Sequence, residues 1–111
     1  MKGDLKLPEI DLIENDVHYI SFVLKEKDLT TGAISVYDLS NVSQINFYMR
    51  KYGSTVNTIE ATCEVVTATL GLCRVKVTVP VEGTYSSQIE VVESGQTITW
   101  EGPVINVIGE I

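Results

Sequence analysis

Residues 44–51, reading Q-I-N-F-Y-M-R-K, alternate strictly between polar and apolar side chains, and this pattern leaves few folds open to the chain. In an extended strand, successive side chains point to opposite faces. The stretch therefore predicts a β-strand with one buried and one solvated face, preceded by turn residues at 38–43 and followed by Gly53. The apolar face carries Ile45, Phe47 and Met49, and the polar face carries Gln44, Asn46, Tyr48 and Arg50.

The same two-residue rhythm recurs along the chain. About eight short strands result, with turn signals roughly every 8–12 residues and no helical periodicity of useful length. This organisation predicts an all-β sandwich or barrel, and a Greek-key sandwich is the commoner outcome at this size. A loop is expected at 25–32 and a turn at 67–71. The further strands are expected at 17–25, 33–37, 59–65, 72–79, 85–92, 97–101 and 104–108.

The 111 residues are enough for one domain with its own core. Residues 15–111 are expected to form that domain. Residues 1–14 are expected to be either a first edge strand, where Pro8 is tolerated, or an arm that lies on a neighbouring subunit. The apolar residues of this segment are Leu5, Leu7, Ile10, Leu12 and Ile13.

The charge balance argues against two classes of partner. Eight basic residues against fifteen acidic ones give a formal charge of −7. Binding to nucleic acid or to anionic lipid needs clustered lysine and arginine, so neither nucleic acid nor a membrane is expected as a partner. The chain also has no apolar run of about 18 residues and no signal-peptide pattern at its start, which predicts synthesis in the cytoplasm without export.

The residues that could support chemistry are few. His18 is the single histidine, and zinc sites or Ser–His and Cys–His systems need histidine beside other ligands or a nucleophile. The acids at 11, 14 and 16 match no calcium-loop signature and are interpreted as a solvated turn. Glycine-rich phosphate loops are absent. We therefore expect no enzyme, no catalytic residue, no metal and no cofactor.

Cys63 and Cys73 are predicted to face each other across a hairpin whose turn is centred near Ala68, both on the inward face. Such a pair can form a disulfide if the geometry is favourable. The alternative is a pair of buried thiols that pack as small hydrophobic residues. Because no export signal is present, reduced thiols are favoured.

Gly83-Thr84-Tyr85 is typical of the tyrosine corner of immunoglobulin-like sandwiches, in which the tyrosine hydroxyl binds an upstream backbone group. Trp100 lies on a short late strand and is most simply a core or rim residue. A lone tryptophan can also anchor an interface, so both roles are kept.

Several blocks follow one another in an order that resembles the N-terminal domain family of phage baseplate upper proteins. The resemblance covers about residues 15–108, and the D-L-S and F-Y-M-R-K blocks are its most specific parts. The blocks are I-S-F-V-L at 20–24, D-L-S at 38–40, I-N-F-Y-M-R-K at 45–51, a glycine at 71 before an alternating strand, G-T-Y at 83–85 and S-G-Q at 94–96.

The resemblance implies an immunoglobulin-like antiparallel β-sandwich, of about seven to nine strands, that attaches fibre or receptor-binding parts in a tailed-phage virion. It also implies other virion proteins as partners, a homo-oligomer (trimer or higher), and assembly in the host cytoplasm. In the family this domain precedes a longer remainder, whereas this chain stops at Ile111. A truncated fibre protein or a small stand-alone capsid-decoration or head-fibre subunit would each explain that difference.

Contact residues for such assembly are expected among the apolar N-terminal residues and two aromatic residues. They are Leu5, Leu7, Ile10, Leu12, Ile13, Tyr48 and Trp100. The alternative function is a carbohydrate- or protein-binding sandwich module of a bacterial surface protein, which would use loop aromatics such as Tyr37, Tyr52 and Trp100.

Overall fold

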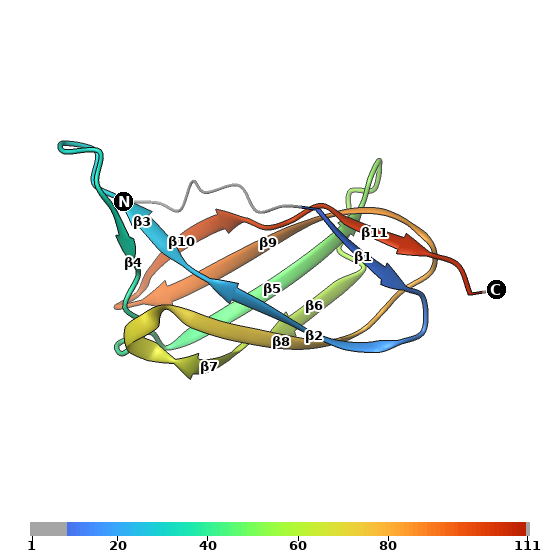
Figure 1. Cartoon of the computed structure of the whole chain (residues 1–111), viewed down its shortest axis with the longest axis horizontal. Coiled ribbons are helices and arrows are strands. Elements are labelled where there is room, and N and C mark those ends of the chain that lie inside the picture. The colour runs from blue at the N-terminus through green and yellow to red at the C-terminus, as the bar shows by residue number, and fades with distance from the viewer. Residues whose placement is uncertain (1–8, 111) are drawn as a thin grey trace.

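Eleven strands arranged in two packed sheets and one hairpin make up the computed structural model, which describes residues 9–110 (Figure 1). A single 3₁₀ turn, η1 (Ala68–Leu70), interrupts them. The strands are β1 (Ile10–Ile13), β2 (Val17–Val23), β3 (Lys25–Lys27), β4 (Ile34–Val36), β5 (Gln44–Lys51), β6 (Ile59–Thr62), β7 (Glu64–Thr67), β8 (Leu72–Thr78), β9 (Gly83–Glu93), β10 (Gln96–Glu101) and β11 (Ile105–Ile108).

The larger sheet has the order β1-β11-β9-β5-β6, and the smaller one has the order β2-β8-β7. Strands β10 and β11 pair with successive parts of β9, along the edge that β5 leaves free, and so act as one interrupted strand. Every pairing is antiparallel except that of β1 with β11. The chain is thus an all-β, immunoglobulin-like sandwich, as the sequence predicted.

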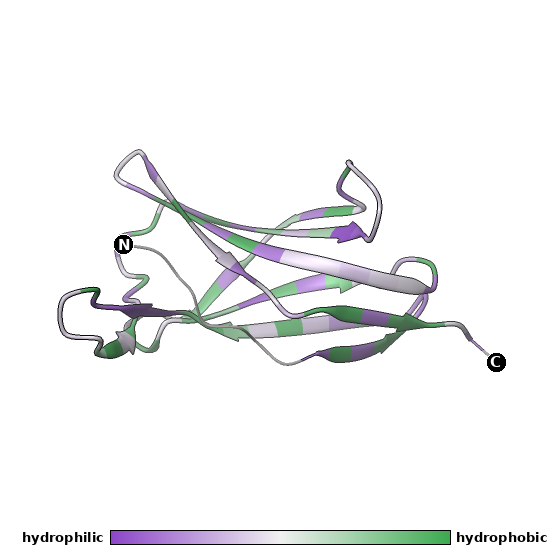
Figure 2. Cartoon of the chain, turned by 90° about the horizontal axis from the view of Figure 1, so that it is seen from above, coloured by the Kyte–Doolittle hydropathy of each residue, from purple (hydrophilic) through white to green (hydrophobic). Residues whose placement is uncertain are grey.

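The core lies between the sheets and is filled by the predicted inward residues. On β5, Ile45, Phe47 and Met49 are all buried, and the Phe22 ring from β2 stacks on Phe47 with 5.7 Å between ring centroids. Seen from above, hydrophobic and hydrophilic segments alternate along the strands of both layers (Figure 2). The two-residue alternation read from the sequence therefore decides which side chain of each long strand enters the core.

The predicted tyrosine corner is confirmed. Tyr85 is fully buried at the start of β9, and its hydroxyl donates to the Val81 carbonyl oxygen at 2.7 Å. Burial raises the pKa of this hydroxyl. In antibody domains a disulfide cysteine follows two residues after the corner tyrosine. That position is Ser87 here, a buried side chain whose hydroxyl donates to the Pro103 carbonyl oxygen at 2.6 Å.

The eleven strands exceed the expected seven to nine because β3 forms where a loop was expected and because the strand expected at 59–65 is divided into β6 and β7. The loop predicted at 25–32 is shorter than expected: Lys25–Lys27 form β3, which pairs with β4 in a hairpin that projects beyond the sheets at one end (Figure 1). The Asp28 carboxylate organises the hairpin turn by accepting from the Thr30 backbone N–H at 2.8 Å. The expected strand at 59–65 breaks at Cys63, whereas the strands expected at 97–101 and 104–108 are found as β10 and β11.

The N-terminal segment was expected to be either an edge strand or an arm, and residues Ile10–Ile13 form an edge strand. They form β1, which pairs in parallel with β11. Leu12 packs into the core, and the Asn15 N–H donates to the Val79 carbonyl oxygen at 2.9 Å as the chain turns into β2. Leu5 and Leu7 lie outside the described residues.

Candidate functional site

Two of the expected contact residues belong to the core of the chain itself. Leu12 is 8% exposed and Trp100 is 3% exposed, so the interface role given to them is wrong. Trp100 pairs with Ile89 on the inner face of the large sheet, and its indole N–H donates to the Lys25 carbonyl oxygen at 2.8 Å. Its apolar ring is buried and its single polar group is satisfied, which is how tryptophan enters a core.

The remaining expected contact residues that the structure describes do not form one surface. Ile10 is partly buried against the core, Ile13 is exposed on β1, and Tyr48 lies on the outer face of the large sheet. The aromatic set expected for a surface-binding module is also divided. Tyr37 is buried and meets Trp100 edge to face with 5.2 Å between ring centroids, so only Tyr52 of that set is exposed.

The sequence predicted that the two cysteines lie directly opposite each other, and this prediction is wrong. Val65 is the partner of Cys73, and the register of β7 against β8 shifts after Val65. Cys63 lies between β6 and β7, and its N–H donates to the Ile45 carbonyl oxygen at 2.8 Å. Both cysteines are buried free thiols. A hydrogen bond to the Cys73 sulfur, together with burial, raises the pKa of the Cys63 thiol.

The single histidine and two of the acids near the N-terminus, Glu14 and Asp16, interact with neighbouring side chains or backbone groups of the chain itself. The His18 ring nitrogen Nε2 lies 3.8 Å from a carboxylate oxygen of Asp16 on an exposed surface. Glu14 ties together two remote backbone segments by accepting from the N–H groups of Glu82 at 3.0 Å and Glu110 at 3.3 Å. In the part of the chain from 9 to 110, no three His, Cys, Asp or Glu side chains gather as a metal site.

The D-L-S block forms a local turn. The Asp38 carboxylate accepts from both the backbone N–H of Ser40 at 2.8 Å and its hydroxyl at 2.5 Å. These two bonds lower the pKa of the Asp38 carboxyl. Leu39, between them, is buried in the core. The block therefore fixes the approach to β5, and its geometry is that of an Asx turn.

One candidate surface is the outer face of β2, which we call the β2 face and define by Val17, Tyr19 and Val23. These side chains are 57%, 52% and 45% exposed. Strand β2 is at the end of its sheet, so among residues 9–110 only β8 pairs with it. The Arg74 guanidinium from β8 lies over the Tyr19 ring, 4.2 Å from its centroid, and also pairs with Glu64. Sequence reasoning did not select these residues as contacts.

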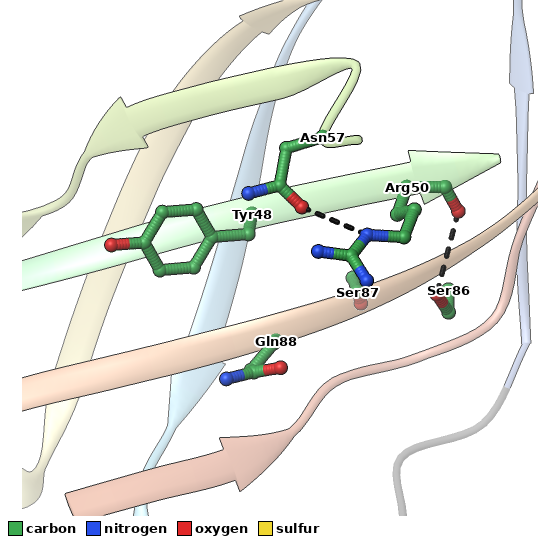
Figure 3. A pocket seen from close by; sticks show the side chains of 6 residues that line it. All are labelled: Tyr48, Arg50, Asn57, Ser86, Ser87 and Gln88. Atoms are coloured by element: carbon green, nitrogen blue, oxygen red, sulfur yellow. Dashed lines mark hydrogen bonds between the residues drawn. The ribbon is translucent and has the colours of Figure 1, made fainter. Parts of the chain in front are cut away.

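A second candidate surface is the polar groove on the outer face of the large sheet, which consists of two hollows that share Tyr48. The larger has a volume of about 330 Å³ and the smaller about 80 Å³. Figure 3 shows the smaller hollow, in which Arg50 reaches from β5 toward Asn57. The larger hollow is lined by Gln44, Asn46, Tyr48, Glu60, Ala61 and Thr62, and the smaller by Tyr48, Arg50, Asn57, Ser86, Ser87 and Gln88.

Hydrogen bonds between neighbouring strands hold the side chains of the polar groove in place. The Glu90 carboxylate on β9 accepts from the Asn46 amide at 3.1 Å and from the Tyr48 hydroxyl at 3.2 Å. The Gln44 amide donates to the Asn46 side-chain oxygen at 2.7 Å. Burial and the nearby Glu90 charge raise the pKa of Tyr48, so its hydroxyl keeps its proton at neutral pH. The alternation at 44–51 predicted the polar face but gave no sign of its neighbours on β6 and β9.

Within residues 9–110, no helix has the length and apolar character needed to cross a membrane. No protein-family model matches the chain, and a search of curated proteins finds no match.

Proposed function

We propose that the chain is a non-enzymatic structural protein of a tailed-phage virion, in the baseplate, the tail, or a head fibre or capsid decoration. In this role it attaches or assembles fibre or receptor-binding parts through protein–protein contacts. Two features support the proposal: the sequence blocks that resemble the baseplate upper protein family, and the immunoglobulin-like sandwich that this resemblance implies. A net charge of −7 agrees with protein partners rather than nucleic acid.

The observation that carries the proposal is the β2 face together with the outer edge of β2, with which no strand among residues 9–110 pairs. Natural edge strands are usually protected by lysine, proline or a bulge, because unpaired backbone groups invite another strand. Strand β2 contains neither lysine nor proline, and its pairing with β8 runs from Val17 to Val23 without a bulge. An extended segment of a partner can therefore add to β2, while exposed apolar side chains provide contact area beside the new pair.

The proposal includes a homo-oligomer, and its symmetry restricts how β2 is used. Two β2 strands paired with each other would give a twofold dimer. A trimer or larger ring instead requires β2 of one copy to meet a different surface of the next copy. The outer edge of β6, at the far end of the large sheet, is a strand edge of that kind, since no other strand in the described part of the chain pairs with it.

Light scattering on variants of the β2 face tests this role. We expect the wild-type chain to form an oligomer, and the double variant Val17→Lys/Val23→Lys to give the monomer mass. The matched control is Val56→Lys, because Val56 is also an exposed valine, at 69%, but lies in the 52–58 loop outside every strand. The proposed use of β2 fails if all three chains have the same mass.

The expected contribution of Leu5 and Leu7 needs a separate deletion. Removal of residues 1–13 would also remove β1 and the core residue Leu12, so it would change the fold together with any contact. Removal of residues 1–8 leaves β1 in place. If that shorter chain keeps the wild-type mass in solution, the two leucines make no assembly contact.

The virion role itself is tested by gene context and by direct assembly. We expect capsid, tail or fibre genes beside the gene for this chain, and a stable complex when the chain is co-expressed with the adjacent fibre or tail protein. The β2 double variant should lose that complex, whereas Val56→Lys should keep it. Neighbouring genes for bacterial surface proteins or secretion would contradict the virion role.

A further inference from the structure

The polar groove differs in chemistry from the outer face of the small sheet. Sheets commonly have one solvated face, and on β8 it carries Arg74, Lys76 and Thr78, which are ordinary surface residues. The outward residues of β5 are instead two amides, a tyrosine and an arginine, and β9 adds Gln88 and Glu90 beside them. Amides carry both donors and acceptors, so this face can serve a ligand that also has both.

Much of the hydrogen-bonding capacity of the groove is unused by the protein. The Asn57 side chain accepts from the Arg50 Nε–H at 3.2 Å and donates to the Glu60 carboxylate at 2.9 Å. The bond between Arg50 and Asn57 does not use the terminal N–H groups of the guanidinium. For Gln88, no side-chain hydrogen bond occurs within residues 9–110. The ordered pairs fix the orientation of the groups, while the unused donors and acceptors face the solvent.

Tyr48 gives the groove an apolar platform at its centre. The residue is half-buried, and its hydroxyl is held by Glu90. Figure 3 shows the ring lying along the ribbon of β5, with one face turned toward the open side of the sheet. An aromatic face of this kind packs against apolar C–H groups of a ligand, and the surrounding amides bind its hydroxyl groups.

The size and charge of the groove further limit the ligand. The hollow of about 330 Å³ is within the usual range for small-ligand sites, roughly 300–1,000 Å³. From Gln44 to Arg50 the groove extends about 20 Å at the rise of a β-strand. Among the described residues that line it, Arg50 is the single cation, and the carboxylates of Glu60 and Glu90 lie nearby. An elongated, hydroxyl-rich and uncharged molecule fits these conditions better than an anionic one.

From these features we propose that the polar groove binds a neutral oligosaccharide, with one sugar ring on Tyr48 and hydroxyl groups on the amides to either side. The site shares no residue with the β2 face. Its residues Glu60, Ala61 and Thr62 lie on β6, whose edge a ring assembly would use, so the two roles are separated by variants at Tyr48 and on the β2 face. The site also differs from the loop aromatics considered from the sequence. A virion protein and a surface-binding module could each use such a site.

The test is an NMR titration of the full-length ¹⁵N-labelled chain. The probes are neutral oligomers of β-1,4-linked glucose, α-1,4-linked glucose, β-1,4-linked mannose and β-1,4-linked N-acetylglucosamine, with any neutral hit from a glycan array added. Polygalacturonate oligomers serve as the acidic comparison. We expect at least one neutral probe to shift the backbone amide signals of residues 44–50, 60–62 and 86–90 in a saturable manner.

Substitutions in the polar groove distinguish a specific sugar-binding site from an ordinary solvated sheet face. We expect Tyr48→Ala to weaken binding of that probe about tenfold or more, and Gln88→Ala about threefold, through loss of stacking and of an amide contact. The matched control is Lys76→Ala, an exposed substitution on the outer face of the other sheet, which should bind like wild type. If Tyr48→Ala does not keep a folded spectrum, Gln44→Ala takes its place with an expected threefold loss.

Four results would overturn the proposal: no neutral probe shifts these signals, only the acidic probe does so, the shifts lie on the β2 face, or both groove variants bind like wild type. The two proposals also fail separately. Tyr48→Ala is expected to leave the solution mass unchanged, and Val17→Lys/Val23→Lys is expected to leave the sugar response unchanged.

Discussion

Removing the hydroxyl of Tyr85 isolates the energetic contribution of the tyrosine corner. The Tyr85→Phe substitution keeps the ring, which is 0% exposed, and deletes only the group that donates to the Val81 carbonyl oxygen at 2.7 Å. No cavity of side-chain size is created. The change in stability therefore reports the hydrogen bond that fixes the β8–β9 corner rather than a repacked core.

The expected loss in the free energy of unfolding is about 1–2 kcal/mol. A typical intramolecular hydrogen bond contributes about 1 kcal/mol net, and a partner left unsatisfied costs up to about 3 kcal/mol. Val81 is exposed, so water can replace part of the lost bond at its carbonyl oxygen and the upper limit is not reached. For a domain of this size, such a loss lowers the melting temperature by roughly 5–10 °C.

Urea unfolding followed by circular dichroism measures this loss, with Tyr52→Phe as the matched control. Tyr52 is 59% exposed, and its substitution should change stability by less than about 0.5 kcal/mol. The reasoning is refuted if Tyr85→Phe costs less than about 0.5 kcal/mol, or if the two substitutions cost the same. A changed denaturant slope would indicate an altered unfolded or native state instead.

Three further predictions concern the backbone, the pH dependence and the thiols. Gly71→Ala should lower the free energy of unfolding by at least about 1 kcal/mol more than Gly95→Ala. Both glycines have positive φ, but of the two only Gly71 would place a Cβ against a backbone oxygen, that of Leu24 at 2.7 Å. Equal losses in urea unfolding would contradict this steric argument. Burial, followed by the hydrogen bond to the Glu93 carboxylate, raises the pKa of Tyr37 to about 12. The protonated hydroxyl therefore contributes fully to the free energy of unfolding below about pH 10, and this contribution is lost as the pH rises through about 12. Stability of Tyr37→Phe should therefore fall less steeply than that of wild type in this window, and parallel curves would disprove the assignment. The two cysteine thiols should react with Ellman's reagent only after denaturation, since both are buried; rapid labelling of the folded chain would show that they are accessible.

The strand pattern could be predicted because it depends on local alternation. The buried set Ile45, Phe47 and Met49 follows from a period of two residues, whatever lies across the core. The corner at Tyr85 could also be predicted, since a glycine and a tyrosine at the start of a strand form a short-range sequence signal. Strand β3 was missed because its three residues are all charged and give no alternation with apolar side chains.

Positions that depend on pairing between distant strands were predicted less well. The expectation that Cys63 faces Cys73 assumed a turn centred near Ala68, whereas the pairing of β7 with β8 is displaced along the chain so that Val65 faces Cys73. The polar groove is a similar case. Its residues come from β5, β6, β9 and the 52–58 loop, and only the sheet order brings them to one face.

By itself, the sequence determined that this chain is an all-β sandwich, which side chains of the long strands enter the core, and where the corner tyrosine lies. These properties depend on the geometry of a single strand, in which every second side chain shares a face. The tertiary structure alone decided that Leu12 and Trp100 are core residues, that β1 pairs in parallel with β11, and that the β2 face stays free among residues 9–110. Those outcomes depend on which strands become neighbours, and a period of two residues carries no information about a partner strand.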